Sequence, residues 1–281
     1  MTDDVKWLAQ GFFLTEGPRM DGKGDLYFGD VTGHGLYRCR PGRAVEAIDA
    51  ERRSVGGVVV DEAGGIICSG REGLMRFDPA TGERRAIPVV IDGVAVTDIN
   101  DIEADAAGNL YGGTLDYQAF EEGRAPGPSI VFRLNRDGSA ERLAERTIPN
   151  GMDFTADGGR FFLSESGDGV FTYAIAADGS LADRRLFAAL PDSDGIALDS
   201  AGGLWVARYL TNVLEYYAPD GTLVRSVALP FGAVASVTFG GPDLTDLIVA
   251  GGDLHTRGLG GILSIEVETP GLPARKTGVW A

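Results

Sequence analysis

The sequence of 281 residues contains few of the side chains that build common catalytic and metal sites. It has two cysteines, Cys39 and Cys68, and two histidines, His34 and His255. The cysteines have no CxxC spacing and the histidines no HExxH spacing, so we expect neither a cysteine zinc site nor a multi-histidine metal site. A Ser-His-Asp catalytic set is not expected either.

Basic residues are also scarce in comparison with acidic ones. The chain has 25 Lys and Arg residues against 41 Asp and Glu residues, a formal net charge of -16. A nucleic-acid phosphate backbone or an anionic membrane would be repelled by this charge. We therefore expect a small-molecule substrate and no nucleic-acid or membrane partner, and no obligate protein partner is evident in the sequence.

Long hydrophobic runs are missing. No apolar stretch reaches 18 residues, and Met1–Lys6 has neither a basic region nor a hydrophobic segment. The pattern of a membrane span or a secretory signal is therefore lacking, and we expect a cytoplasmic protein. With 44% hydrophobic residues the chain is typical of a globular protein, and we expect residues 1–281 to form a single domain.

Glycine, by contrast, is abundant, with 42 residues, and much of it lies in a repeated unit. Six times an apolar strand is followed by a Gly- and Asp-rich turn and a second strand. The turns begin near residues 21, 61, 105, 155, 199 and 242, with spacings of 40, 44, 50, 44 and about 43. A third and a fourth strand complete each unit, and no helical period of useful length occurs. Units of this length are typical of propeller blades, so the sequence predicts an all-β, six-bladed β-propeller with four antiparallel strands per blade.

A ring of blades must be closed, because otherwise the first and last blades would leave unpaired strand edges. The third strand of the last repeat, near residues 262–267, lacks a following partner in the sequence. The segment 5–10, before the first repeat, has the composition of a strand. We expect this N-terminal strand to pair into the last blade and close the ring.

One polar residue interrupts the apolar pattern at the same place in four of the repeats. Along a strand, side chains alternate with a period of two, so this residue shares a face with the apolar residues that follow it. Equivalent positions of successive blades surround the axis of a propeller, and we expect these side chains to meet there. The polar residues are Glu16, Asn100, Asn150 and Asp194, and the second and sixth repeats have Gly56 and Ser236 at this place.

Two carboxylates and two amides form a ligand set made of oxygen alone. Carboxylates this close cannot all stay ionised without a cation between them. Hard cations prefer oxygen ligands, so we expect one divalent cation, with calcium first and zinc, manganese or magnesium as alternatives. A simpler interpretation, in which each polar residue only caps a turn, explains any one of the four but not their common phase.

The segments around these residues resemble a known family. Glu16-Gly-Pro, Asn100-Asp, Pro149-Asn-Gly, Ser193–Asp199 and Gly271-Leu-Pro are similar to the gluconolactonase, senescence marker protein (regucalcin) and luciferin-regenerating enzyme family, over nearly the whole chain. The resemblance implies one metal on the axis, bound by Glu16, Asn150 and Asp194. It also implies that Asn100 contacts the substrate or reaches the metal, and that Asp194 doubles as general base. Family members hydrolyse sugar lactones, and a more distant relative cleaves organophosphorus fluorides.

We therefore expect a divalent-metal-dependent lactonase that opens a sugar-derived lactone by attack of metal-activated water, with Asp194 as catalytic base. Two alternatives stay open, because a fold does not determine a reaction. The same metal site could serve phosphoester hydrolysis or a lyase or hydratase step. The protein could also be a calcium-binding propeller without catalytic activity.

The candidate substrate contacts begin with a departure from the family. Sugar lactonases of this family commonly carry an arginine two residues before the asparagine, and this chain has Asp98 there. Arg53, just before the second repeat, is a candidate for the missing positive charge, although an exposed loop arginine is the simpler interpretation. The longest spacing between repeats contains the segment 115–128, which is long enough to form a lid. The expected substrate-binding residues are Asn100, Asp98, Arg53, Asp116 and Tyr117, with His255 a further candidate for the rim.

Overall fold

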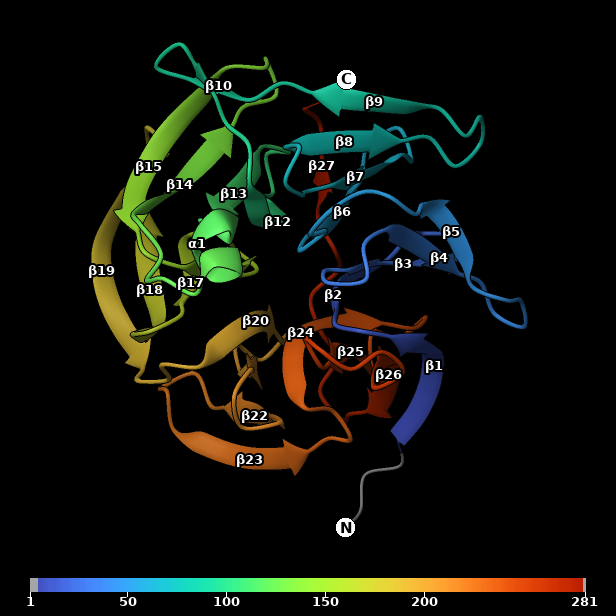
Figure 1. Cartoon of the computed structure of the whole chain (residues 1–281). Coiled ribbons are helices and arrows are strands. Elements are labelled where there is room, and N and C mark those ends of the chain that lie inside the picture. The colour runs from blue at the N-terminus through green and yellow to red at the C-terminus, as the bar shows by residue number, and fades with distance from the viewer. Residues whose placement is uncertain (1–4, 280–281) are drawn as a thin grey trace.

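Alternating apolar strands and Gly/Asp turns fold into six antiparallel blades around one axis (Figure 1). The structure is a computed structural model, and it describes residues 5–279. Blade 1 consists of β2 (Thr15–Met20), β3 (Leu26–Asp30), β4 (Leu36–Cys39) and β5 (Glu46–Asp49). Blade 2 contains β6 (Val58–Asp61), β7 (Ile66–Cys68), β8 (Leu74–Phe77) and β9 (Arg84–Ile87), and blade 3 contains β12 (Ile99–Ala104), β13 (Leu110–Thr114), β14 (Ser129–Leu134) and β15 (Ala140–Arg146).

The remaining three blades repeat this order. Blade 4 has β16 (Pro149–Phe154), β17 (Arg160–Glu165), β18 (Gly169–Ile175) and β19 (Leu181–Ala188). Blade 5 has β20 (Ser193–Leu198), β21 (Leu204–Arg208), β22 (Val213–Tyr217) and β23 (Leu223–Ala228). Blade 6 has β24 (Ala233–Gly240), β25 (Asp246–Gly252), β26 (Gly260–Glu266) and β1 (Val5–Phe12). The first strand of each blade is the inner one, and successive inner strands contact one another around the ring.

The predicted closure of the ring is confirmed. Strand β1 pairs antiparallel with β26, with Val5 opposite Ile265 and Phe12 opposite Gly260. The N-terminal strand is thus the outer strand of a blade whose other three strands come from the end of the chain. The prediction of an all-β, six-bladed propeller is confirmed with it.

Four elements were not predicted. Helix α1 (Tyr117–Glu122) lies between β13 and β14, and with six residues it is too short to give a helical period in the sequence. It is the only α-helix in residues 5–279, and no helix in that range is long and apolar enough to cross a membrane. Strands β10 (Val90–Ile91) and β11 (Val94–Ala95) form a hairpin between blades 2 and 3. Strand β27 (Lys276–Thr277) adds to blade 2 by pairing parallel with β6.

The segment that leads to β27 crosses the ring. It begins beside blade 5, where the backbone N–H of Ser200 donates to the carbonyl of Pro270 at 2.8 Å. It ends at blades 2 and 3, where the N–H of Glu62 donates to the carbonyl of Thr277 at 2.9 Å. Figure 1 shows β27 in red beside β6, near the centre of the ring. This C-terminal strap, residues 268–279, therefore lies across the end of the ring at which the inner strands finish.

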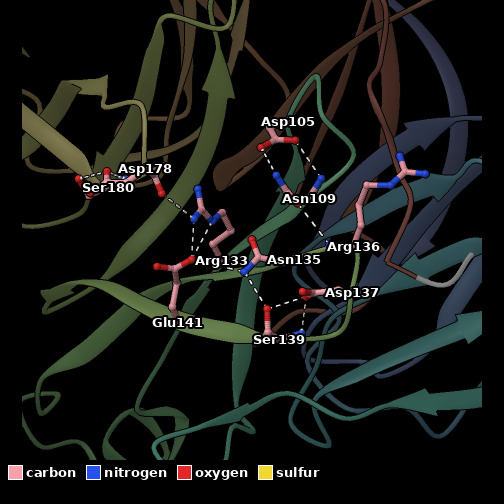
Figure 2. A network of polar contacts seen from close by, with 10 residues as sticks. All are labelled: Asp105, Asn109, Arg133, Asn135, Arg136, Asp137, Ser139, Glu141, Asp178 and Ser180. Atoms are coloured by element: carbon pink, nitrogen blue, oxygen red, sulfur yellow. Dashed lines mark hydrogen bonds and ion pairs between the residues drawn. The ribbon is translucent and has the colours of Figure 1, made fainter.

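Aspartate side chains fix the turns of the blades. In blade 3, Asp105 Oδ1 accepts a hydrogen bond from the backbone N–H of Asn109 at 2.9 Å, and Asp137 Oδ1 accepts one from Ser139 at 2.9 Å (Figure 2). Because such a carboxylate satisfies the backbone of its own turn, Asp recurs at the start of the repeats. Arg133 joins blade 3 to blade 4 by donating to the carbonyl of Asp178 at 3.1 Å.

Candidate functional site

The inner strands approach most closely at the glycines that follow the polar positions. A Cβ on Gly151 would lie 2.6 Å from the carbonyl oxygen of Asp194, and one on Gly195 would lie 2.6 Å from Ser236 Cα. A Cβ on Gly17 would lie 2.7 Å from the carbonyl oxygen of Gly56. Only glycine leaves room for these contacts between neighbouring inner strands. The starts of the inner strands are therefore drawn together around the axis.

A pocket of about 410 Å³ lies at this end of the ring, and Glu16, Asn100, Asn150 and Asp194 all line it. Each comes from the inner strand of a different blade, β2, β12, β16 and β20. Ser236 on β24 lies next to them in the ring, where its Oγ accepts a hydrogen bond from the N–H of Gly17 at 3.3 Å. The structure thus places side by side the four polar residues that share one phase in the sequence.

The two carboxylates of this group lack a counter-charge. Within residues 5–279, neither Glu16 nor Asp194 makes a side-chain hydrogen bond or an ion pair. Burial raises the pKa of the Glu16 carboxyl well above its usual value, and the charges of Asp194 and Asp101 raise it further. Burial, followed by the charge of Asp101, also raises the pKa of Asp194, which is 6% exposed. An uncompensated buried pair of this kind is costly, and a cation between the two groups would remove the cost.

The two amides are held in place by hydrogen bonds. Asn100 Nδ2 donates to Asn150 Oδ1, and Asn150 Nδ2 donates to Ser166 Oγ at 2.8 Å. The hydroxyl of Tyr117 donates to Asn100 Oδ1 at 2.8 Å. Each amide oxygen keeps a second lone pair, so both can still accept a ligand.

The donor set fits a hard divalent cation. Residues 5–279 contain no group of three or more His, Cys, Asp and Glu side chains placed to hold a metal, so amide oxygens must complete any site here. Glu16, Asp194 and Asn150 offer carboxylate and amide oxygens from three blades, with Asn100 next to them. Oxygen ligands without imidazole or thiolate suit calcium better than zinc.

Asp98 and Arg53, two of the predicted substrate contacts, do not line the pocket. Asp98 Oδ1 pairs with Arg71 Nε at 3.1 Å. Arg53 pairs with Glu72 at 3.0 Å, and its side chain is 51% exposed. In both cases a neighbour of opposite charge holds the side chain outside the pocket, so Arg53 does not replace the family's arginine there.

Two more predicted contacts, Asp116 and Tyr117, lie at the start of helix α1, and only one of them lines the pocket. Asp116 is the N-cap of the helix and accepts a hydrogen bond from the N–H of Ala119 at 3.0 Å, which keeps the Asp116 carboxylate out of the pocket. Tyr117, the first residue of the helix, lines the pocket. The guanidinium of Arg71, which pairs with Asp98, lies 5.6 Å from the centre of the Tyr117 ring. His255 is also absent from the pocket lining.

Sequence reasoning missed the lining residues that follow the second strand of a blade. The first two strands of a blade are antiparallel, so the residues after the second strand lie beside the start of the first. Pro149, for example, lies opposite Glu165, which places Ser166 next to Asn150. The antiparallel pairing of the first two strands could have identified these residues in the sequence. A search for polar residues at one phase of the first strand does not include them. Residues in this position that line the pocket include Val31, Ser166, Tyr209 and Leu254.

Comparison with known proteins agrees with this architecture. Residues 14–252 match the family described as the SMP-30/gluconolactonase/LRE-like region. The chain belongs to this family. All four polar residues of the pocket lie inside the matched range of the SMP-30/gluconolactonase/LRE-like family, and the C-terminal strap lies outside it.

Two curated relatives and one solved structure illustrate the similarity to this family. The pentonolactonase XacC of Haloferax volcanii is 33% identical over 240 residues, which are 81% of this chain and 78% of the relative. The L-arabinolactonase of Azospirillum brasilense is 31% identical over 213 residues, 73% of this chain and 70% of the relative. The structure of regucalcin from Agrobacterium tumefaciens, described as a calcium-binding protein, superposes with a TM-score of 0.81 at 19% identity and covers 98% of both chains.

Proposed function

We propose that this family member is a divalent-metal-dependent lactonase, which hydrolyses a cyclic ester to a hydroxy acid. The observation that carries the proposal is the pair of unpartnered carboxylates, Glu16 and Asp194, that face one pocket together with Asn100 and Asn150. The names of two relatives, a pentonolactonase and an L-arabinolactonase, support the same reaction class and make sugar lactones the first substrates to test.

Glu16, Asn150 and Asp194 are the residues that would hold the cation, with calcium favoured by the oxygen donors. A divalent cation bound there would polarise the lactone carbonyl and make water more acidic. Glu16 has no other partner among the described residues, and we assign it to cation binding alone.

Asp194 is the residue that we assign as general base. Its carboxyl is buried and accepts no hydrogen bond within residues 5–279, so nothing from the protein lowers its affinity for a proton. In the proposed reaction Asp194 takes a proton from water as the water oxygen bonds to the acyl carbon. The bond between that carbon and the ring oxygen then breaks, and the proton passes from Asp194 to the ring oxygen. The products are a carboxylic acid and a hydroxyl on one chain, and the acid releases its remaining proton to solvent to become a carboxylate.

Asn100 and Tyr117 are the residues that we assign to substrate orientation. The hydroxyl of Tyr117 holds the amide of Asn100 at 2.8 Å, and both side chains line the pocket. A fixed amide can hold the ester in one orientation with respect to Asp194, which raises the rate without changing the chemistry.

The test combines metal removal with one substitution. We expect chelation to abolish lactone hydrolysis in a pH-stat assay while the circular dichroism spectrum is retained, and calcium to restore activity when zinc, manganese and magnesium are tried beside it. Asp194→Asn should lower kcat by about 100-fold or more. Asp243→Asn, at an exposed turn position, is the matched control and should change neither property. If the chelated protein hydrolyses lactones at the original rate, the metal has no part in the reaction. If the protein unfolds on chelation and never hydrolyses a lactone, it is a calcium-binding propeller without catalytic activity.

A further inference from the structure

The walls of the pocket differ in chemistry from the four polar residues. Large apolar side chains line it, and they come from loops or strands of five blades and from α1. These residues lie far apart in the sequence, and what they share is their position around the axis of the propeller. The wall residues that matter here are Val31, Leu115, Phe120, Ile148, Leu210 and Leu254.

No basic side chain lines the pocket among residues 5–279. Of the charged lining residues, Asp192 is already engaged, because its Oδ1 accepts a hydrogen bond from Arg208 Nε at 2.7 Å. The other two are Glu16 and Asp194, which we assign to the cation and the proton. The pocket therefore offers no guanidinium or ammonium group to a hydroxyl-rich substrate.

The neutral polar groups are mostly committed to one another. Tyr117 donates its hydroxyl hydrogen to Asn100, and Ser166 donates its own to the carbonyl of Ser193 at 2.5 Å. Among the lining hydroxyls of the described chain, that of Tyr209 is the one without a hydrogen bond. A substrate hydroxyl that is buried without a hydrogen-bond partner lowers the affinity for that substrate by about tenfold. The neutral groups that remain open are the Tyr209 hydroxyl and one lone pair on each amide oxygen, which are few partners for a ring that carries several hydroxyls.

Three of the wall side chains are unusually exposed for their size. Phe120 is 51% exposed, Leu210 is 77% exposed and Leu254 is 40% exposed. Single exposed apolar residues are common, but three around one pocket make an apolar rim that a ligand can cover. The volume of about 410 Å³ is in the range of pockets that enclose drug-sized ligands, so there is room for a substituent beyond a lactone ring.

We infer that the preferred substrates are lactones that carry an apolar alkyl or aryl substituent, and not polyhydroxylated lactones. The inference rests on the proposed lactonase function and specifies its substrate class. The ester lies at Asn100, beside the residues that would hold the cation, and the substituent packs against Leu210, Leu254 and the facing wall. Each methylene group buried there raises affinity by about fourfold.

The test compares kcat/KM for three lactones with the metal-loaded protein: δ-decalactone, unsubstituted δ-valerolactone and D-glucono-δ-lactone. We expect kcat/KM for δ-decalactone to exceed that for each of the other two by about tenfold or more, because several methylene groups of its alkyl chain are buried against the wall. A D-glucono-δ-lactone value equal to or above that of δ-decalactone would overturn the substrate class while leaving the lactonase proposal standing. Hydrolysis of none of the three above the rate of Asp194→Asn would overturn the lactonase proposal itself.

Substitutions at the rim separate recognition from folding. Leu210→Asn and Leu254→Asn remove apolar contact at exposed positions, so they should fold and raise KM for δ-decalactone by about tenfold. KM for δ-valerolactone, which has no substituent to reach these positions, should rise less. Leu186→Asn is the matched control, since Leu186 is 56% exposed on β19 and does not line the pocket. An unchanged KM for δ-decalactone in both rim variants would overturn the proposed contact.

Discussion

Replacing Arg275 by methionine should destabilise the propeller, because Arg275 fastens the C-terminal strap to blade 4. Its Nη1 pairs with Asp153 Oδ1 at 3.3 Å, and its Nη2 donates to the carbonyls of Phe154 at 3.0 Å and Thr155 at 2.8 Å. The side chains of Arg275 and Asp153 are 13% and 16% exposed. Methionine keeps much of the packing volume and removes every one of these polar contacts.

The magnitude follows from leaving Asp153 without its partner. Removing one member of a buried ion pair costs about 3–5 kcal/mol, and we expect the lower end, about 3 kcal/mol, because the pair keeps some contact with water. For a chain of this length each kcal/mol lowers Tm by about 2 °C, so Tm should fall by about 6 °C.

The loss of stability in Arg275→Met should depend on pH, and the pKa of Asp153 determines the direction of that dependence. Burial raises this pKa to about 6, the charge of Glu103 acts in the same direction, and Arg275 opposes both. Because the pKa in the folded state is above the unfolded value, the stability that protonation contributes is present below about pH 4 and is lost as the pH rises through about 6. Without Arg275 the folded pKa rises further. The loss of stability in Arg275→Met should therefore be larger at pH 8 than at pH 5.

Urea unfolding followed by tryptophan fluorescence at both pH values measures this loss. Arg185→Met is the matched control, because Arg185 pairs with Asp183 at 2.9 Å on the surface and is 65% exposed. Its loss should be about 0–1 kcal/mol at either pH. The reasoning is refuted if Arg275→Met loses no more stability than this control, or if its loss is the same at pH 5 and pH 8.

Three further predictions concern the inner ring and the pocket. Gly151→Ala should cost about 1–3 kcal/mol in urea unfolding, since its Cβ would lie 2.6 Å from the backbone of the next blade, whereas Gly22→Ala, with no atom within 4 Å, should be neutral. Tyr117→Phe should lower kcat/KM for lactones by about tenfold and Tm by only about 2 °C, because Asn100 loses the one hydrogen bond that orients it. An unchanged kcat/KM would remove Asn100 orientation from the mechanism. Glu16→Gln should abolish calcium binding in calorimetry and raise the stability of the metal-free protein, because it replaces a buried carboxylate that has no partner. A metal-free variant less stable than the original protein would show that the charge of Glu16 is compensated.

The fold and the polar ring could be predicted because both depend on local patterns. A strand of period two inside a repeat of about 40 residues determines which side chains of each blade face the axis. Glu16, Asn100, Asn150 and Asp194 share that phase, so their convergence needed no coordinates. The need for closure likewise determined that β1 would pair with β26.

Other features required the tertiary structure, because they depend on which loops meet above or below the ring. Asp98 looked like a substrate contact until its pairing with Arg71, 27 residues away, placed it outside the pocket. The apolar walls combine residues from five blades. Wall residues of different blades lie too far apart in the sequence for a local pattern to connect them.

The strap shows the same division. Its sequence, Gly271-Leu-Pro, resembled the family without indicating a path, and the parallel pairing of Lys276 with Val60 joins residues more than 200 positions apart. By itself the sequence determined the blades, their number and the ring of polar residues at the axis. Only the tertiary structure decided what surrounds that ring, because contacts between loops depend on distances in space that no periodicity along the chain encodes.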